Sequence, residues 1–228
     1  MIPSLSVLNH KPLTDKCVIL DLDECLVHSF EDMDAYHKLG IAVNPEYLDL
    51  RARIHLITME DAVDVRGTGD KSTMWCITRP YLKEFLVFVH TYFKVKIVWS
   101  AGVKRYVHAV VESIFNMTAP HFVYTRDDTI KDSNGIRRKP IQKLLDESPV
   151  LSKHVTMYNT YVIDDNEDTF GQNVHNAIRI PVFNPNPTIE GLRQDDHALY
   201  NIMNWLSLPE VMYSKDVRGL DKRRIFSS

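Results

Sequence analysis

The sequence is poor in glycine, and this shortage excludes the familiar glycine-rich phosphate loops. Glycine makes up 8 of the 228 residues, which is about half of its usual share. No glycine is followed by lysine, so a P-loop is excluded. The single Gly-x-Gly stretch, Gly67 to Gly69, lacks the third glycine of a dinucleotide-binding fingerprint. If this protein handles phosphate, it does so without a glycine-rich cradle.

Cysteines are also few, and the net charge is small. Cys17, Cys25 and Cys76 lack Cys-x-x-Cys spacing, which argues against a disulfide framework or a zinc knuckle and favours an intracellular location, nuclear or cytoplasmic. A net charge of −3 gives no basic face for nucleic acid. The first ten residues lack a signal-peptide pattern, and no apolar run is long enough to span a membrane. We expect no direct nucleic-acid partner and no membrane association, and we assume a monomer.

Length and composition fit one globular domain. Hydrophobic residues make up 44% and charged residues 25% of the chain, both typical of folded soluble domains. We expect a single domain over 1–228, with a core at about 14–208, a small β insert at about 41–77 and a polar C-terminal tail at about 214–228.

Buried-strand patterns alternate with amphipathic helical patterns along the chain, which predicts an α/β fold with a parallel sheet flanked by helices. The expected strands are 16–21, 95–99, 122–124, 161–163 and 177–182, and the expected helices are 80–89, 104–114, 140–145 and 199–206.

The insert has a different pattern. Residues 51–57 alternate in polarity, with Ala52, Ile54 and Leu56 on one side of a half-exposed strand. Further strand patterns at 63–66 and 74–77 are separated by a turn signal at 67–70. These features predict a small antiparallel sheet, too short to form a large cap over a site.

Paired acids follow two of the expected parallel strands. Asp21 and Asp23 come at the end of the first strand, and Asp164 and Asp165 at the end of a later one. An isolated pair of this kind is usually a helix cap or a turn. Because the carboxyl ends of parallel strands meet at one edge of a sheet, the two pairs together predict a carboxylate cluster, which would favour a hard cation such as Mg²⁺.

The sequence of residues 21–29, Asp-Leu-Asp-Glu-Cys-Leu-Val-His-Ser, resembles the Asp-Leu-Asp-Glu-Thr-Leu-Val-His-Ser signature of the FCP/SCP-like protein phosphatases. This branch of the haloacid dehalogenase superfamily removes phosphate from serines of the RNA polymerase II C-terminal domain and of other proteins. The resemblance runs from about 16 to 206 and implies a haloacid dehalogenase-like sheet with no large cap. The other matching segments, in order, are 78–80 with 84–86, 98–101, Lys139 with Lys143-Leu144, and 162–165 continuing into 176–178.

The resemblance implies roles for individual residues. Asp21 would be the nucleophile that forms an aspartyl-phosphate, and Asp23 would be the general acid and base. Ser100 and Lys139 would bind the phosphoryl oxygens. Without the resemblance, a serine after a strand indicates a helix cap and a lysine before proline indicates a solvated loop.

The resemblance also implies a Mg²⁺ site. Asp165 would ligate the metal directly, Asp164 would either ligate it or hold a metal-bound water, Asp21 would supply another carboxylate, and Asp23 would supply its backbone carbonyl. Arg126 matches an arginine near the substrate groove in relatives, although a surface ion pair explains it equally well.

Two departures from the family pattern limit what can be carried over. Cys25 replaces the usual threonine or valine, which implies lower activity, sensitivity to oxidation or inert packing, the last being the usual behaviour of a small buried cysteine. The insert at 41–77 matches poorly, and in relatives this region helps to bind peptide. Substrate choice is therefore the least transferable inference.

An uncovered site admits a phosphorylated peptide, whereas phosphatases of small metabolites commonly enclose their substrates. This argument favours a protein serine/threonine phosphatase, and the resemblance implies that it is Mg²⁺-dependent and acts through an aspartyl-phosphate, on phosphoserine peptides like those of the RNA polymerase II C-terminal domain. The alternatives are a small-metabolite phosphatase and a catalytically silent relative that binds a partner.

Overall fold

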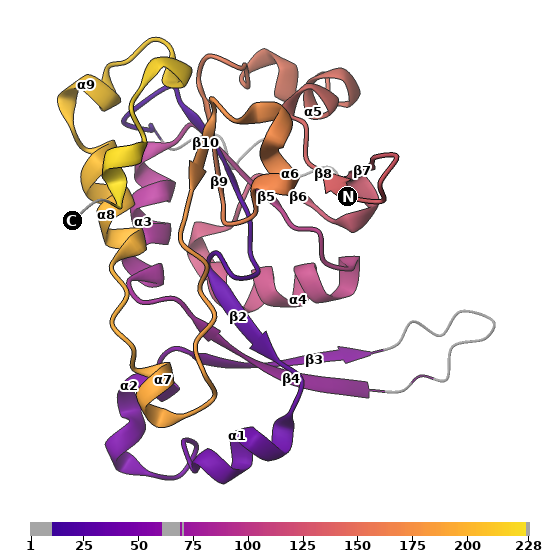
Figure 1. Cartoon of the computed structure of the whole chain (residues 1–228), viewed down its shortest axis with the longest axis vertical. Helices are drawn as coiled ribbons and strands as arrows, with labels where there is room; N and C mark the ends of the chain where they lie inside the picture. Colours follow the sequence, from indigo (N-terminus) through magenta and orange to yellow (C-terminus); the bar gives the residue numbers. More distant parts are fainter. Residues whose placement is uncertain (1–10, 61–68, 70, 227–228) are drawn as a thin grey trace.

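The computed structural model of the chain describes residues 11–60, 69 and 71–226. Its central element is a five-stranded parallel sheet with the strand order β10-β9-β1-β5-β6 (Figure 1). The strands are β1 (Cys17–Leu20), β5 (Val95–Trp99), β6 (Phe122–Tyr124), β9 (Thr160–Asp164) and β10 (Ala177–Arg179). The expected α/β fold with a parallel sheet is confirmed.

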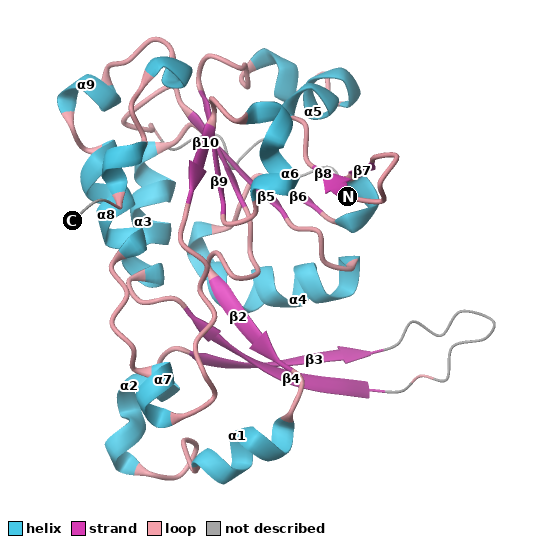
Figure 2. Ribbon diagram, viewed as in Figure 1, coloured by secondary structure: helices cyan, strands magenta, loops and turns pink. Residues whose placement is uncertain are grey.

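Helices cover both faces of this sheet (Figure 2). Side chains alternate along β1, so that Val18 and Leu20 pack in the core formed with α3, α4 and α8, whereas Cys17 and Ile19 pack with α5 and α6. Because both faces are covered, every β1 side chain is buried, which explains its unbroken apolar run. The helices are α3 (Leu82–Tyr92), α4 (Lys104–Phe115), α5 (Ile141–Glu147), α6 (Glu167–Phe170) and α8 (Ala198–Leu206).

A second, antiparallel sheet with the order β2-β4-β3 lies next to this core (Figure 1). It has its own small apolar cluster, in which Trp75 and Ile77 of β4 pack with Tyr36 and Leu50. The elements of this part are β2 (Val27–Phe30), α1 (Met33–Leu39), α2 (Leu48–Arg51), β3 (Ile54–Glu60) and β4 (Lys71–Thr78). The expected antiparallel sheet is present. Its first strand, β2, lies upstream of residue 41, and the helices α1 and α2 lie between β2 and β3 in the sequence.

The strand expected at 51–57 differs in its bounds and in which of its side chains are buried. Residues up to Arg51 belong to α2, so β3 begins only at Ile54. Ile57 is 2% exposed whereas Leu56 is 53% exposed. Leu56 therefore lies on the exposed side of the strand, contrary to what its place in the apolar row predicted. The strand expected at 63–66 and all of the turn at 67–70 except Gly69 lie outside the described residues.

The remaining elements are short. A two-stranded hairpin joins β7 (Ile130–Lys131) to β8 (Arg137–Arg138), and α7 (Ile189–Leu192) and α9 (Pro209–Met212) flank α8 in the sequence. Short 3₁₀ segments include η4 (Arg126–Asp128), η7 (Val217–Gly219) and η8 (Arg223–Ile225). Within the described part of the chain, none of the helices has the length and apolar character needed to cross a membrane.

The C-terminal segment is not simply a polar tail. Val217 and Ile225 are buried and belong to the same apolar cluster as α3 and α8. The residues on either side of Val217 and Ile225 in the sequence are mostly polar, and the segment has no helical or strand periodicity. The sequence pattern therefore does not indicate which of its side chains are buried. The expectation of a polar tail from 214 is therefore wrong at Val217 and Ile225, whose side chains belong to the core.

Truncating Ile225 tests this correction. We expect Ile225→Ala to lower the free energy of unfolding by about 2–4 kcal/mol, since a buried isoleucine loses both its transfer energy and its packing. Leu13→Ala is the control, because Leu13 is 65% exposed. Urea unfolding of both variants measures the effect, and equal, small losses would show that the segment does not contribute to the core.

Candidate active site

The carboxyl ends of three neighbouring strands bring distant residues to one edge of the sheet. Asp21 directly follows β1, Ser100 directly follows β5, and Asp164 is the last residue of β9. In the register, Leu20 is paired with Val98 on one side and with Ile163 on the other. Strand β1 therefore lies at the switch point of the sheet, where open α/β folds bind their ligands.

The loop after β1 is a tight turn that leads into the second sheet. The backbone N–H groups of Leu26 and Val27 both donate to the carbonyl of Leu22, at 2.8 and 3.0 Å. Glu24 has a φ of 54°, in the left-handed region that side chains rarely adopt. This turn reverses the chain immediately after the first acid, which keeps Asp23 beside the same sheet edge.

The buried side chain of Arg79 stabilises this turn by hydrogen bonding to its backbone. Its guanidinium donates to the carbonyl of Cys25 at 3.1 Å and makes a two-pronged contact with Asp196 at 2.9 and 2.8 Å. Arg79 is 1% exposed, and Asp196 is the carboxylate that pairs with its buried charge. Arg79 lies in the Thr-Arg-Pro match of the sequence, which gave no indication of Asp196.

Lys139 is the cation at the centre of the acid cluster. Its Nζ lies 2.8 Å from Oδ1 of Asp21 and 2.9 Å from Oδ2 of Asp164. The lysine is 2% exposed, and its backbone N–H donates to the carbonyl of Thr169 at 2.7 Å. One buried ammonium thus joins the acids that end β1 and β9.

Asp164 is held by several donors. Its Oδ1 accepts from the backbone N–H of Asn166 at 2.9 Å, and its Oδ2 accepts from Lys139 and from the hydroxyl of Thr169, the latter at 2.7 Å. The carboxylate is 1% exposed. Asp165 follows it at the surface of the same loop and is only partly buried.

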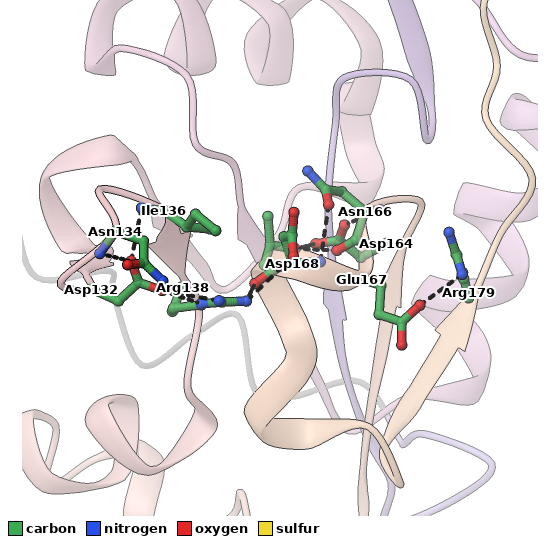
Figure 3. A network of polar contacts seen from close by, with 10 residues as sticks. Asp132, Asn134, Ile136, Arg138, Asp164, Asn166, Glu167, Asp168 and Arg179 are labelled. Atoms are coloured by element: carbon green, nitrogen blue, oxygen red, sulfur yellow. Dashed lines mark hydrogen bonds and ion pairs between the residues drawn. The ribbon is translucent and has the colours of Figure 1, made fainter.

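A chain of polar contacts connects the β7–β8 hairpin to this acid loop (Figure 3). Asp132 accepts from two backbone N–H groups of the hairpin turn and pairs with Arg138, whose Nε donates at 3.0 Å. Arg138 also donates to the carbonyl of Asp168, and the N–H of Asp168 donates to the side chain of Asn166. Because Lys139 directly follows Arg138, the hairpin and the acid loop are fixed relative to each other.

Asp23 is held by hydroxyl groups instead. Ser100 Oγ donates to its Oδ2 at 3.1 Å, and the Tyr106 hydroxyl donates to its Oδ1. Ser29 Oγ lies 2.8 Å from the Tyr106 hydroxyl. The two acids of the first motif therefore differ in their surroundings, since Asp21 faces an ammonium and Asp23 faces neutral hydroxyls.

Burial dominates the electrostatics of these groups. Burial raises the pKa of Asp21 well above its usual value; Lys139 opposes this, while the neighbouring carboxylates add to it. Burial also raises the pKa of Asp23, against its hydroxyl donors. Burial and the charge of Asp164 raise the pKa of Asp165 to about 6. For Lys139, burial alone would lower the pKa, but its two carboxylate partners outweigh it and raise the pKa above the usual value.

The acid cluster has the donor set of a hard cation site. Carboxylate oxygens of Asp21, Asp164 and Asp165 lie within 4.8 Å of one another. Oδ1 of Asp21 is buried and has the lysine charge beside it but no aligned hydrogen-bond donor. One lysine offsets only part of the negative charge of these acids, and the repulsion between carboxylates adds to the effect of burial on the pKa of Asp21 and of Asp165. Oxygen ligands of this kind suit Mg²⁺.

Two further residues from the sequence analysis lie at this edge. Arg126 is exposed in η4, where its Nε donates to the carbonyl of Ala101 at 2.9 Å, so it lies next to the residues that follow Ser100. Cys25 is fully buried, donates to the carbonyl of Ile163 at 3.7 Å, and has a pKa raised well above its usual value by burial. These features favour the inert-packing interpretation of Cys25.

The residues that support the predicted ones were not predicted from the sequence. Tyr106 donates to Asp23 and Thr169 donates to Asp164. Ser29 contacts Tyr106, and Asp196 accepts from Arg79. Tyr106 lies one residue before Val107 in α4, and both side chains are buried. Its contact with Asp23 is long-range and had no local signal.

Comparison with known families identifies this arrangement. Residues 16–218 match the model of the NLI interacting factor-like phosphatases, so the chain belongs to that family. The family resemblance inferred from the motifs is confirmed. A comparison with curated proteins finds no significant match.

Solved structures share the fold. One is fission yeast Fcp1, an RNA polymerase II CTD phosphatase, as an arginine-to-alanine variant bound to beryllium fluoride; it has a TM-score of 0.58 and 19% identity over 83% of this chain and 49% of that one. Another is Fcp1, described as an essential RNA polymerase II CTD phosphatase, with a TM-score of 0.56 and 18% identity over 91% of this chain and 58% of that one. The match thus spans about half the length of these structures.

Removing Arg79 tests whether its buried ion pair holds the motif turn. We expect Arg79→Ala to cost about 3–5 kcal/mol of unfolding free energy, because Asp196 and the Cys25 carbonyl lose their partner. Arg193→Ala is the matched control, since Arg193 makes the same two-pronged contact with Asp49 but at the surface, where solvent screens it. Chemical denaturation that showed equal losses for the two variants would contradict this role.

Proposed function

We propose that the chain is a Mg²⁺-dependent protein serine/threonine phosphatase that acts through an aspartyl-phosphate on Asp21. The observation that carries this proposal is the placement of two acids with different surroundings at one sheet edge. Asp21 is ion-paired with buried Lys139, while Asp23 accepts hydrogen bonds from hydroxyls. A nucleophile should be ionised, and Lys139 favours the ionised form of Asp21 against the burial that raises its pKa. An acid–base group should exchange a proton, and Asp23 has neutral hydroxyl partners and a pKa that burial raises.

In the first step, a carboxylate oxygen of Asp21 forms a bond to phosphorus, and the bond between phosphorus and the serine or threonine oxygen breaks. Asp23 gives its proton to that leaving oxygen, which departs as an alcohol. Lys139 and Ser100 stabilise the charge that spreads over the non-bridging phosphoryl oxygens. For this, the Ser100 hydroxyl turns from Asp23 to the phosphate.

In the second step, water attacks the phosphorus of the aspartyl-phosphate and gives a proton to Asp23. The bond between phosphorus and the Asp21 oxygen breaks, which releases inorganic phosphate and restores the carboxylate. Each acid thus returns to its starting state. Lys139 also pairs with Asp164, at 2.9 Å, so it has a second carboxylate partner besides the nucleophile.

Asp21, Asp164 and Asp165 are the residues proposed to hold Mg²⁺ with their side chains, and Asp23 the one proposed to use its backbone carbonyl, since its side chain contacts Ser100 and Tyr106. Asp164 already accepts three hydrogen bonds, which supports a role through a metal-bound water as much as direct ligation. Mg²⁺ supplies positive charge that offsets the acids and the phosphoryl oxygens.

Phosphorylated peptides are the proposed substrates, including serine-phosphorylated segments of the RNA polymerase II C-terminal-domain type. The segment between Ser100 and Lys139 contains one longer helix and otherwise short elements, and Asp23 and Asp165 are partly exposed. An open site of this kind accepts a chain. Arg126 lies exposed beside it and would contact the bound peptide. Support also comes from the fold, which is shared with Fcp1, a CTD phosphatase.

The nucleophile is tested by Asp21→Asn. We expect hydrolysis of p-nitrophenyl phosphate in Mg²⁺ to fall by at least about 10³-fold, the scale of losing a catalytic nucleophile. Asp127→Asn, at an exposed acid of η4, is the control and should retain wild-type rates. Equal rates for wild type and Asp21→Asn would show that the nucleophile is misassigned, and absence of activity in the wild type would favour a silent, partner-binding protein.

The metal site is tested by Asp165→Asn. Because loss of an outer-shell partner alone typically costs about 10–100-fold in metal affinity, we expect the Mg²⁺ concentration for half-maximal activity to rise by at least about tenfold. Asp168→Asn changes an exposed carboxylate in α6, which follows this loop, and should leave that concentration unchanged. A matching change in Mg²⁺ affinity by calorimetry is the second readout; an unchanged affinity would remove Asp165 from the ligand set.

Substrate class is tested by comparing kcat/KM for phosphoserine and phosphothreonine peptides with kcat/KM for sugar and nucleotide phosphates. We expect the peptides to be preferred, because the site is open and Arg126 extends the contact surface beyond the phosphate. Arg126→Ala should reduce the peptide values while leaving p-nitrophenyl phosphate unaffected. A clear preference for the metabolites would instead support a small-metabolite phosphatase.

A further inference from the structure

The hydroxyl contacts of Asp23 distinguish its two oxygens. We propose that Tyr106 is a positioning residue that anchors Oδ1 of Asp23 and thereby assigns Oδ2 as the oxygen that delivers the proton to the leaving group. This inference rests on the proposed phosphatase function. It adds to that function a residue that sits outside the motifs of the family resemblance.

The anchoring contact has a fixed direction. The Tyr106 hydroxyl donates to Oδ1 of Asp23, and a phenol has only one proton to give. Ser29 Oγ lies 2.8 Å from the same hydroxyl, so Ser29 is the donor in that contact. The result is a one-way relay from Ser29 through Tyr106 to Asp23. Tyr106 is only 8% exposed, so water does not easily replace it as the donor.

The other oxygen is held differently. Oδ2 accepts from Ser100 Oγ at 3.1 Å, and Ser100 Oγ in turn accepts from the backbone N–H of Gly102 at 2.9 Å. In the proposed reaction the Ser100 hydroxyl turns away from Asp23 and donates its hydrogen bond to a phosphoryl oxygen, while keeping its proton. Oδ2 of Asp23 then lacks this donor, whereas Oδ1 keeps the hydrogen bond from Tyr106. Oδ2 is then the oxygen that can carry a proton.

The consequence appears when the bond between phosphorus and the leaving oxygen breaks. The proton moves from Oδ2 to the leaving oxygen, and the negative charge that appears on Asp23 is stabilised at Oδ1 by Tyr106. A strongly basic leaving group, such as the serine oxygen, needs this proton. A nitrophenolate departs without it. The contribution of Tyr106 should therefore grow with the basicity of the leaving group.

A purely structural role makes a different prediction. If Tyr106 only filled space on α4, or only touched the substrate, its loss would reduce the rates of all substrates of equal size by the same factor. The dependence of rate on the leaving group separates these roles. Using kcat/KM restricts the comparison to the step in which Asp21 is phosphorylated, because that ratio includes events only up to the first irreversible step.

The experiment measures kcat/KM of wild type and Tyr106→Phe for a series of aryl phosphates of similar size, from p-nitrophenyl to phenyl and methoxyphenyl phosphate, and for a phosphoserine peptide. General acid catalysis is worth about 10²–10⁴-fold, so a displaced acid should lower kcat/KM for the peptide by about 10–100-fold. The loss for p-nitrophenyl phosphate should stay below about 3-fold, since its leaving group makes little use of the acid. The slope of log(kcat/KM) against leaving-group pKa thus becomes steeper.

Tyr92→Phe is the matched control, because Tyr92 is also buried and its hydroxyl donates to the carbonyl of Leu206 at 2.8 Å, away from the site. It should leave the slope unchanged. If Tyr106→Phe does not fold, Ser29→Ala removes the first donor of the relay and should steepen the slope in the same direction. An unchanged slope in the folded variant, whether the rates fall in parallel or stay the same, would overturn the proposal. It would leave the phosphatase assignment intact, because that stands on wild-type activity and Asp21→Asn.

Discussion

The buried ammonium of Lys139 is the interaction on which the rest of the site depends. It pairs with Asp21 at 2.8 Å and with Asp164 at 2.9 Å, and so joins the ends of β1 and β9. Clustering acids away from water is unfavourable, and a single lysine offsets only part of it. Burial raises the pKa of Asp21, and the neighbouring carboxylates add to this effect against Lys139. Oxygens of Asp21, Asp164 and Asp165 lie within 4.8 Å of one another, as a cation site requires. In the proposed function, both the metal and the phosphate would bind at the site that this lysine organises.

The residues that contact the two acids of the first motif give them different surroundings. Asp21 lies against charge and Asp23 against hydroxyls, although only one residue separates them in the sequence. The turn after β1 creates this difference, because it reverses the chain after Asp21 and directs Asp23 toward β5 and α4. Arg79 fixes the turn from inside the protein. Such a site needs neither a glycine-rich loop nor an excess of charge, which is compatible with a chain that has few glycines and a net charge of −3.

The parts that could be predicted from the sequence are those in which local pattern and global position agree. The apolar run of β1, followed at once by Asp21, indicated both a buried strand and the place where it ends. Strand β2 gave no such signal, because only one of its four side chains is fully buried and its partner lies in β4. Lys139 was found through the family resemblance alone, since nothing in its own surroundings in the sequence indicates burial. Tyr106 was missed because its partner lies 83 positions away.

The central claim is that phosphate passes through a covalent bond to Asp21, and chemical trapping tests it most directly. An acyl phosphate is reduced by borohydride to the corresponding alcohol, so quenching the enzyme with borohydride during turnover of a phosphopeptide should convert Asp21 to homoserine. Peptide mass spectrometry then locates the change. We predict homoserine at position 21, dependent on substrate and absent from Asp23. Turnover with no modification at Asp21, or with the modification at another carboxylate, would contradict the account.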